Sequence, residues 1–241
     1  MEIIAEIQNL KKSFATNHVL KDLSFTINKG ENLVVFGRSG SGKSVLIKCM
    51  VGLITPDEGK VELIGENILE LKDEALNGLR KKIGFLFQGA ALYDSMSVRE
   101  NLEFPLRDLK SKAKEEIDEL VKEALENVGL IKAIDKMPSE LSGGMRKRVG
   151  LARAIILKPE IILYDEPTTG LDTITSKEIS HLILDIQKKY NTASIIITHD
   201  IECARMTANK MIVLKDGTSA ASGTFKELEA SKDEEVNVFF K

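Results

Sequence analysis

The chain contains 241 residues, of which 43% are hydrophobic and 29% are charged, a composition that suits one large domain, or a domain with a subdomain, around an ordinary core. Its formal net charge of −3 argues against a nucleic-acid-binding protein, which needs a basic face. No apolar stretch has the length of a membrane span, and residues 1–6 carry acidic rather than basic side chains, unlike a signal peptide. Cys49 and Cys203 lack the spacing of metal ligands, and we interpret both as small core residues in a reducing cytosol.

The first 30 residues alternate apolar and polar side chains, which predicts two strands of an antiparallel layer. We expect residues 11–18 to form the loop between these strands. Phe14 lies in the predicted loop, where its ring could stack on a nucleotide base, a contact worth ~1–3 kcal/mol per base in other proteins. Phe14 could instead be a hydrophobic plug on the loop, and the sequence leaves both interpretations open.

A glycine-rich stretch over residues 37–44, Gly-Arg-Ser-Gly-Ser-Gly-Lys-Ser, fits the phosphate-loop pattern G-x-x-x-x-G-K-[ST] at every fixed position. Residues 32–36 predict a buried strand before it, and residues 45–51 predict a helix after it. In that context the backbone N–H groups can surround a phosphate, and the helix N-terminus adds partial positive charge. We expect Lys43 to reach the β- and γ-phosphates and Ser44 to ligate Mg²⁺, so the stretch predicts a nucleotide site.

The middle of the chain is predicted to complete the small β-layer and then to become helical. Residues 60–65 predict the last strand of the layer, and residues 81–87 predict a buried strand that ends at Gln88. Residues 95–137 are predicted to be helical, with one apolar stripe and an opposite face of mixed charge that we interpret as solvated. A further helix is predicted to begin near residue 141.

The last third of the chain is predicted to alternate strands and helices. The strands cover residues 160–164, 193–198 and 210–214, and the helices cover residues 175–190 and 200–209. An Asp-Gly pair at positions 216 and 217 predicts a hairpin turn. We expect residues 233–241 to form a weakly ordered tail.

Polar residues follow three of the predicted strands: residues 37–44, then Asp165 with Glu166, then His199. In open parallel α/β sheets, ligands bind at the carboxyl ends of the strands. We expect Asp165 to bind Mg²⁺ through water and Glu166 to accept a proton from the attacking water. An isolated Asp-Glu pair after a strand is more often a helix cap, and an isolated His more often a packing residue. The phosphate loop favours the catalytic interpretation of all three side chains.

Together these motifs resemble the ATPase subunit of an ATP-binding-cassette (ABC) transporter over nearly the whole chain. The matching motifs follow in chain order: Phe14 is similar to the adenine-stacking aromatic, residues 37–44 to Walker A, Gln88 to the Q-loop glutamine, residues 141–145 to the signature motif, residues 161–166 to Walker B, residues 169–172 to the D-loop and His199 to the switch histidine. A signature motif upstream of Walker B is specific to ABC ATPases among phosphate-loop proteins.

The resemblance implies that the nucleotide is ATP, that its metal is Mg²⁺, and which residues hold them. It assigns ATP binding to Phe14, Gly37, Arg38, Ser39, Gly40, Ser41, Gly42, Lys43, Ser44, Val45, Gln88, Ser142, Gly143, Gly144, Asp172 and His199. It assigns Mg²⁺ to Ser44, Gln88 and Asp165, and catalysis to Lys43, Gln88, Glu166 and His199.

The resemblance also implies the fold and the partners. The fold would be an α/β P-loop NTPase with a mostly parallel core sheet, an antiparallel β-subdomain and an α-helical subdomain at about residues 90–158, all within one domain over residues 1–241. An ATP-dependent homodimer would form, in which Ser142, Gly143 and Gly144 of one subunit complete the other's site. These three residues start a predicted helix, which is an anion site. An integral membrane permease would hold the cytoplasmic dimer at the inner face of the plasma membrane.

Met145 stands where the family's signature motif usually has Gln, and Met cannot donate a hydrogen bond to the nucleotide. Met145 and the following Arg146, Lys147 and Arg148 resemble ATPases of the Mla type. That type powers phospholipid trafficking in bacteria together with a permease and an MCE-domain lipid-binding protein. The alternative is an ABC ATPase for another cargo, such as an amino acid, a drug or a lipoprotein.

Two other classes of protein are opposed by the sequence. A soluble ABC protein of DNA repair or translation would contain paired cassettes or long coiled coils, and this chain has neither. A binding module with a degenerate site is opposed by the intact Lys43, Asp165, Glu166 and His199.

The residues after Gln88 predict where a permease would bind. Ala90 and Ala91 are small, and the large apolar Leu92 and Tyr93 follow them. We expect this segment to form a shallow groove that accepts a cytoplasmic helix of the permease. The alternative is that Leu92 and Tyr93 pack under the helical subdomain.

Overall fold

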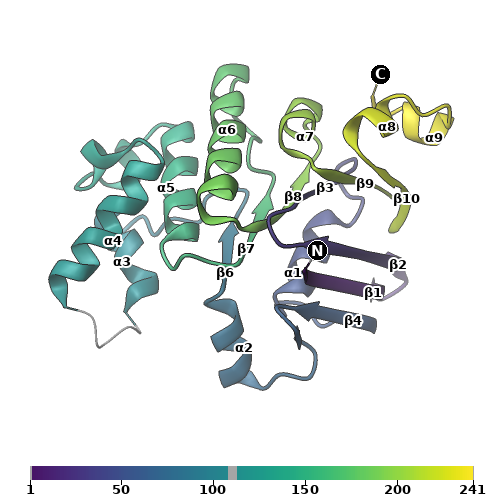
Figure 1. The fold of residues 1–241 in the computed structure, drawn as a ribbon, viewed down its shortest axis with the longest axis horizontal. Helices are drawn as coiled ribbons and strands as arrows, with labels where there is room; N and C mark the ends of the chain where they lie inside the picture. The colour runs from purple at the N-terminus through teal and green to yellow at the C-terminus, as the bar shows by residue number, and fades with distance from the viewer. Residues whose placement is uncertain (1, 108–112, 241) are drawn as a thin grey trace.

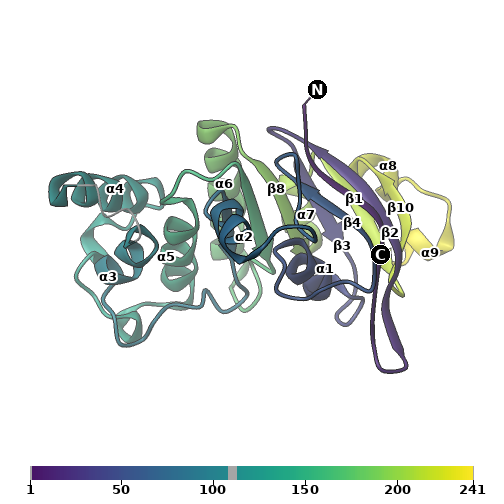
Figure 2. The same ribbon diagram turned by 90° about the horizontal axis from the view of Figure 1, so that it is seen from below.

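The computed structural model describes residues 2–107 and 113–240. Within these residues the strands form a ten-stranded sheet in the order β5-β4-β1-β2-β10-β9-β3-β8-β7-β6, shown in two views in Figures 1 and 2. No helix in the described part of the chain is both long enough and apolar enough to cross a membrane. The sheet order places the last strand of the chain beside the second, because β10 lies next to β2.

The sheet has an antiparallel part and a mostly parallel core. The antiparallel part consists of β1 (Ile3–Phe14), β2 (Asn17–Asn28), β4 (Glu58–Leu63) and β5 (Glu66–Asn67). The core consists of the parallel strands β3 (Asn32–Phe36), β6 (Ile83–Leu86), β7 (Ile161–Asp165), β8 (Ala193–Thr198) and β9 (Lys210–Lys215), with β10 (Thr218–Gly223) as an antiparallel hairpin partner of β9. The predicted fold class, an α/β protein with a mostly parallel core sheet, is confirmed.

The central strands are apolar because both of their faces are covered. Every residue of β3, β7 and β8 is buried, and successive side chains point to opposite faces. Leu33 and Val35 belong to one hydrophobic core together with helix α1 (Lys43–Met50). Val34 and Phe36 belong to a second core, to which helices α5 (Gly143–Ile155), α6 (Thr173–Tyr190) and α7 (Ile201–Thr207) contribute. The strand before the phosphate loop is therefore held from both sides.

Helices α3 (Val98–Glu103), α4 (Lys114–Asn127) and α5 gather at one end of the molecule, on the left in Figure 1. Short 3₁₀ turns at Phe104–Leu106, Ile131–Ala133 and Pro138–Glu140 connect them. The region predicted to be helical, about residues 95–137, contains α3, α4 and several turns among its described residues, and residues 108–112 lie outside the described residues. The limits of a helical subdomain at about 90–158 stay a prediction. Helix α2 (Asp73–Arg80) was not predicted.

The prediction of a loop over residues 11–18 is wrong. Strand β1 continues to Phe14 and β2 starts at Asn17, so Ala15 and Thr16 alone form the turn. Ala15 has φ 52°, a left-handed conformation that tight hairpin turns require. The segment was interpreted as a loop because its side chains are mostly polar. A two-stranded ribbon that extends beyond the core buries neither face. Its sequence therefore lacks the alternation of apolar and polar residues that predicts a strand.

The prediction of a weakly ordered tail over residues 233–241 is also wrong for the residues described. Helix α9 (Glu234–Asn237) follows helix α8 (Phe225–Glu229), and the carboxylate of Asp233 caps its N-terminus. The rings of Phe239 and Phe240 then pack against Phe36, with centroids 6.0 and 6.2 Å from its ring. Two adjacent aromatic residues give no periodicity from which this packing could be predicted.

We predict that Gly84→Ala destabilises the protein. A Cβ at position 84 would lie 2.4 Å from the carbonyl oxygen of Ala154, so β6 could not approach α5 as closely. Overpacking of this kind costs ~1–3 kcal/mol of unfolding free energy, which a urea titration measures.

The matched control is Gly78→Ala, in the exposed interior of α2, where an added Cβ meets nothing within 4 Å. Because alanine favours helices over glycine, this variant should gain ~0.5–1 kcal/mol. Equal stability of both variants would contradict the close packing of α5 on β6.

Candidate functional site

The glycine-rich loop turns from β3 into α1 with a backbone that only glycine adopts easily. Gly40 has φ 82° and Gly42 has φ 103°, and Gly42 is the N-cap of α1. Gly37 lies so close to β9 that a Cβ would be 2.5 Å from the Leu214 carbonyl oxygen. The three glycines of the loop therefore meet separate steric requirements, and a loop of this kind before a helix N-terminus can present backbone N–H groups to a phosphate.

Lys43, the first residue of α1, is folded back over this loop. Its Nζ donates hydrogen bonds to the carbonyl oxygens of Gly37 at 2.8 Å and Arg38 at 3.0 Å. The same Nζ lies 3.4 Å from Oε1 of Glu166, and only 5% of the Lys43 side chain is exposed. A buried ammonium between the phosphate loop and the end of β7 supplies positive charge where a triphosphate would bind.

Ser44 and Asp165 form the part of the site that fits a magnesium ion. The Ser44 hydroxyl donates to Oδ1 of Asp165 over 3.2 Å, across the gap between α1 and β7. Burial raises the pKa of the Asp165 carboxyl, and the hydrogen bond from Ser44 partly offsets this effect. A hydroxyl and a carboxylate are oxygen donors of the kind that Mg²⁺ prefers.

Within residues 2–107 and 113–240, no three or more His, Cys, Asp or Glu side chains cluster as a metal site. Mg²⁺ at Ser44 and Asp165 would therefore need further ligands from water and from phosphate oxygens, as is usual in phosphate-loop proteins. The residues fit a metal that arrives with a nucleotide. They do not fit a resident metal centre.

Glu166 is the residue in which the contacts of the site converge. Its Oε2 lies 2.8 Å from Nδ1 of His199 and accepts a hydrogen bond from the Thr169 hydroxyl at 3.1 Å. An ionised carboxylate only accepts hydrogen bonds, so this arrangement has Nδ1–H of His199 as the donor. The carboxylate of Glu166 is thus oriented on three sides, by Lys43, Thr169 and His199.

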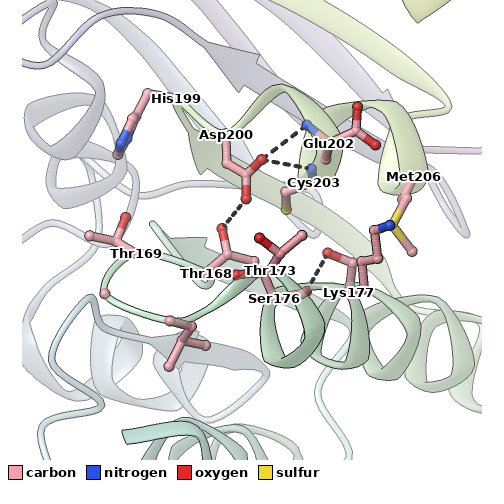
Figure 3. A pocket seen from close by; sticks show the side chains of 13 residues that line it. Thr168, Thr169, Thr173, Ser176, Lys177, His199, Asp200, Glu202, Cys203 and Met206 are labelled. Carbon is pink, nitrogen blue, oxygen red and sulfur yellow. Dashed lines mark hydrogen bonds between the residues drawn. The ribbon is translucent and has the colours of Figure 1, made fainter.

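A second hydrogen bond fixes the separation of Glu166 and His199. Figure 3 shows the pocket of about 420 Å³ beside His199, lined by residues from the loop after β7 and from α6 and α7. There the Thr168 hydroxyl donates to Oδ2 of Asp200 over 2.8 Å, while Oδ1 of Asp200 caps α7. Thr168 lies two residues after Glu166, and Asp200 directly follows His199. Their hydrogen bond therefore holds the side chains of Glu166 and His199 in their relative position.

Most of the predicted site residues lie together. One pocket of about 230 Å³ is lined by Ser39, Gly40, Gly42, Lys43, Ser44, Val45, Gln88, Glu166 and His199, and by Val19, which was not predicted. Asp165 reaches the same place through Ser44. Ser41 and Arg38 lie on the adjoining face of the loop, and the Arg38 guanidinium lies over the Phe239 ring at 5.7 Å.

A second group of predicted residues does not line this pocket. Phe14 stands at the β1–β2 turn with 46% of its surface exposed. Ser142 is the N-cap of α5, and its hydroxyl accepts a hydrogen bond from the Met145 N–H. Gly143 and Gly144 are the first two residues of that helix. Asp172 accepts hydrogen bonds from the Thr175 hydroxyl and from the backbone N–H groups of Thr175 and Ile174, which hold its pKa low. Nucleotide contacts of these residues remain predictions.

Sequence reasoning missed Lys147, whose side chain is buried and hydrogen-bonded at the edge of the site. The available signal was its position on α5: Leu151 and Ala154, four and seven residues on, are both buried. A lysine in a buried helical stripe indicates a specific acceptor.

Comparisons with known proteins agree with this geometry. The sequence profile of a family described as ABC transporter matches residues 20–169. The probable ribonucleotide transport ATP-binding protein mkl of Mycobacterium tuberculosis is 42% identical over 214 residues, which cover 89% of this chain and 60% of mkl. This chain thus spans less than two thirds of that relative.

Two further relatives differ in their named cargo. The intermembrane phospholipid transport system ATP-binding protein MlaF of Haemophilus influenzae is 36% identical over 238 residues, 99% of this chain and 90% of MlaF. The methionine import ATP-binding protein MetN of Clostridium tetani is 37% identical over 223 residues, 92% of this chain and 70% of MetN. A dimeric structure of the ATP-binding cassette MJ0796 in a post-hydrolysis state, bound to ADP and Pi, matches with a TM-score of 0.84 and 32% identity, over 92% of this chain and 99% of that one.

The fold and the phosphate-loop pocket define an ATP-binding cassette. The chain belongs to the ABC transporter family.

We predict that Glu166→Gln keeps ATP binding but lowers kcat by ~10²–10⁴-fold, because the amide has the shape of the carboxylate and cannot accept a proton. Radiolabelled ATP in single-turnover assays gives the rate, and equilibrium binding of ATP gives the affinity. The matched control is Glu160→Gln, one residue before the opposite end of β7, which should leave kcat unchanged. A kcat near that of the unmodified protein would mean that the proton acceptor is another group.

Proposed function

We propose that this chain is the ATP-hydrolysing subunit that powers a bacterial membrane ABC transporter. The observation that carries the proposal is the convergence of Lys43, Ser44, Glu166 and His199 on one pocket, with Asp165 bonded to Ser44. In this proposal Lys43 neutralises the triphosphate, Ser44 and Asp165 hold Mg²⁺, and Glu166 accepts the proton of the attacking water. His199 and Gln88 would face the γ-phosphate.

The proposed active form is a homodimer with shared sites. Ser142, Gly143 and Gly144 start a helix of 13 residues, whose N-terminus favours an anion, yet they do not line the pocket of their own chain. The phosphate that they would bind therefore belongs to a second subunit. The similarity to MJ0796, whose structure is described as dimeric, supports the same arrangement.

We predict that subunits damaged at different halves of the site rescue each other. Each heterodimer of Ser142→Arg and Lys43→Ala subunits has one site with both defects and one site intact, so ATPase activity should reappear on mixing. Steady-state hydrolysis is measured for each variant alone and for the mixture, with heterodimers verified by two different affinity tags. Absence of recovery in verified heterodimers would contradict independent shared sites.

The proposed permease contact is an apolar groove beside Gln88, but its wall is not the one expected. Leu92 packs against the main hydrophobic core, so that half of the alternative interpretation is correct. Tyr93 is 42% exposed, and its ring centroid lies 4.7 Å from that of Phe104. Across the groove the rings of Phe85 and Phe87 stack, with centroids 4.0 Å apart. Four aromatic rings thus line one surface depression.

Basic side chains rim this groove. Arg80, Arg107 and Arg153 all line it, and the guanidinium groups of Arg107 and Arg153 lie over the Phe104 and Tyr93 rings, respectively. An amphipathic helix with an apolar face and an acidic residue is complementary to such a surface. A cytoplasmic helix of the permease is the proposed occupant, and it would keep the ATPase at the inner face of the plasma membrane.

The proposed cargo is phospholipid, handled with an MCE-domain lipid-binding protein. Two observations support it: the Mla-type sequence around Met145, and the similarity to MlaF, which extends over 90% of that relative. The named cargoes of the other relatives, ribonucleotides for mkl and methionine for MetN, define the alternatives. Cargo contacts in this proposal belong to the permease.

We predict that Tyr93→Asp abolishes co-purification with the permease while ATP binding stays unchanged. The substitution removes one of the four aromatic rings, and the new carboxylate would pair with Arg153, which lies over the Tyr93 ring. Both the apolar contact and the charge complementarity to an acidic partner helix would therefore be lost. Affinity purification from detergent-solubilised membranes measures the association.

The matched control is Ile131→Asp, which puts the same carboxylate on another exposed apolar residue, 37% exposed and outside the groove. Retention of the permease by Tyr93→Asp would contradict the groove assignment. The proteins recovered with the unmodified chain also test the cargo. A permease accompanied by an MCE-domain protein is expected, and a methionine or ribonucleotide permease would contradict the lipid proposal while leaving the ATPase assignment intact.

A further inference from the structure

Lys147 is a buried lysine in the helix that begins with the signature residues. It lies in the second turn of α5, and 5% of its surface is exposed. A lysine is rarely buried without a partner, since removing the ammonium from water is costly unless hydrogen bonds compensate. Its surroundings therefore indicate its function.

The acceptors of Lys147 are two backbone carbonyl groups from the site. Its Nζ donates to the carbonyl oxygen of Gln88 in a short hydrogen bond and to the carbonyl oxygen of Glu166 at 3.0 Å. Burial lowers the pKa of this ammonium, and the nearby carboxylates of Asp165 and Glu166 oppose that effect. One side chain of α5 thus joins the end of β6 to the end of β7.

The backbone of Glu166 needs such a restraint. Its φ is 50°, a left-handed conformation that is unfavourable for a residue with a long side chain. The N–H of Glu166 donates to the carbonyl oxygen of Ile197 at 2.9 Å, and its own carbonyl oxygen accepts from Lys147. Hydrogen bonds on both sides of the residue hold the conformation that directs the carboxylate toward Lys43 and His199.

We propose that Lys147 is a positioning residue, which couples the signature helix to the backbone of Glu166 and Gln88. This inference rests on the proposed shared sites of a homodimer. Ser142 and Lys147 are five residues apart on one helix, a rise of about 7.5 Å. Binding of the partner's nucleotide at the helix N-terminus therefore orients the proton acceptor of this chain's own site through α5 and Lys147.

The test compares Lys147→Met with a matched control on the same helix, Arg148→Met. Methionine keeps the apolar stem of either side chain and removes its hydrogen bonds. Arg148 donates to Glu178 at 2.6 Å and to the Val128 carbonyl oxygen, both away from the site, so its loss reports on stability alone. Thermal unfolding, ATP affinity and kcat are measured for both full-length variants.

Lys147→Met should lower kcat on the order of 10²-fold, as a misplaced catalytic group does, while ATP affinity stays within about threefold. Arg148→Met should keep the kcat of the unmodified chain. A normal kcat in Lys147→Met, or an equal loss in both variants, would overturn the proposal. If Lys147→Met does not fold, Lys147→Leu, which also removes both hydrogen bonds, replaces it with the same expected loss of kcat. Failure of both to fold would assign Lys147 to the fold and overturn the proposal too.

A double-mutant cycle separates positioning of Glu166 from any other effect. In a Glu166→Gln background the carboxylate is already lost, so Lys147→Met should reduce the residual rate by less than about threefold. The full reduction in that background would show that Lys147 acts independently of Glu166 and would contradict the proposal. If Glu166→Gln alone leaves kcat unchanged, the assignment of Glu166 fails instead, which is a different result.

Discussion

The register of three adjacent parallel strands determines the site. Phe36 of β3 is paired with Thr198 of β8, and Ile197 of β8 is paired with Asp165 of β7. The three strands therefore end within one residue of each other at the same edge of the sheet. The phosphate loop, Glu166 and His199 each begin where a strand stops, and ladder hydrogen bonds fix their separation. The ion pair of Lys43 with Glu166 and the hydrogen bonds of Ser44 and His199 depend on this common edge.

Much of this arrangement could be predicted from the sequence. A parallel strand that is buried on both faces is a short apolar run, and the polar residue after it marks its carboxyl end. That signal located Asp165, Glu166 and His199 without any knowledge of pairing. Strand pairing itself was not needed, because parallel strands whose ends carry ligands must meet at one edge.

The features that sequence reasoning missed depend on contacts between distant residues. Phe239 and Phe240 are held in place by packing against Phe36. The two-residue turn after Phe14 is determined by the pairing of β1 with β2. For the adjacent Leu92 and Tyr93, which are both large, only tertiary packing decides which one faces the core. Lys147 entered the sequence analysis only through the Mla-type resemblance around Met145, because its acceptors are backbone carbonyls, which every residue has and no sequence motif displays.

The sheet order has a consequence for synthesis of the protein on the ribosome. Among the described strands, β3, which leads into the phosphate loop, pairs only with β8 and β9, and both come from the last quarter of the chain. A nascent chain that already contains the complete Walker A segment has no paired strand to support it until those late strands emerge. Nucleotide capture must therefore wait until translation is nearly finished, and truncated products of this chain have no preformed phosphate site with which to compete for ATP.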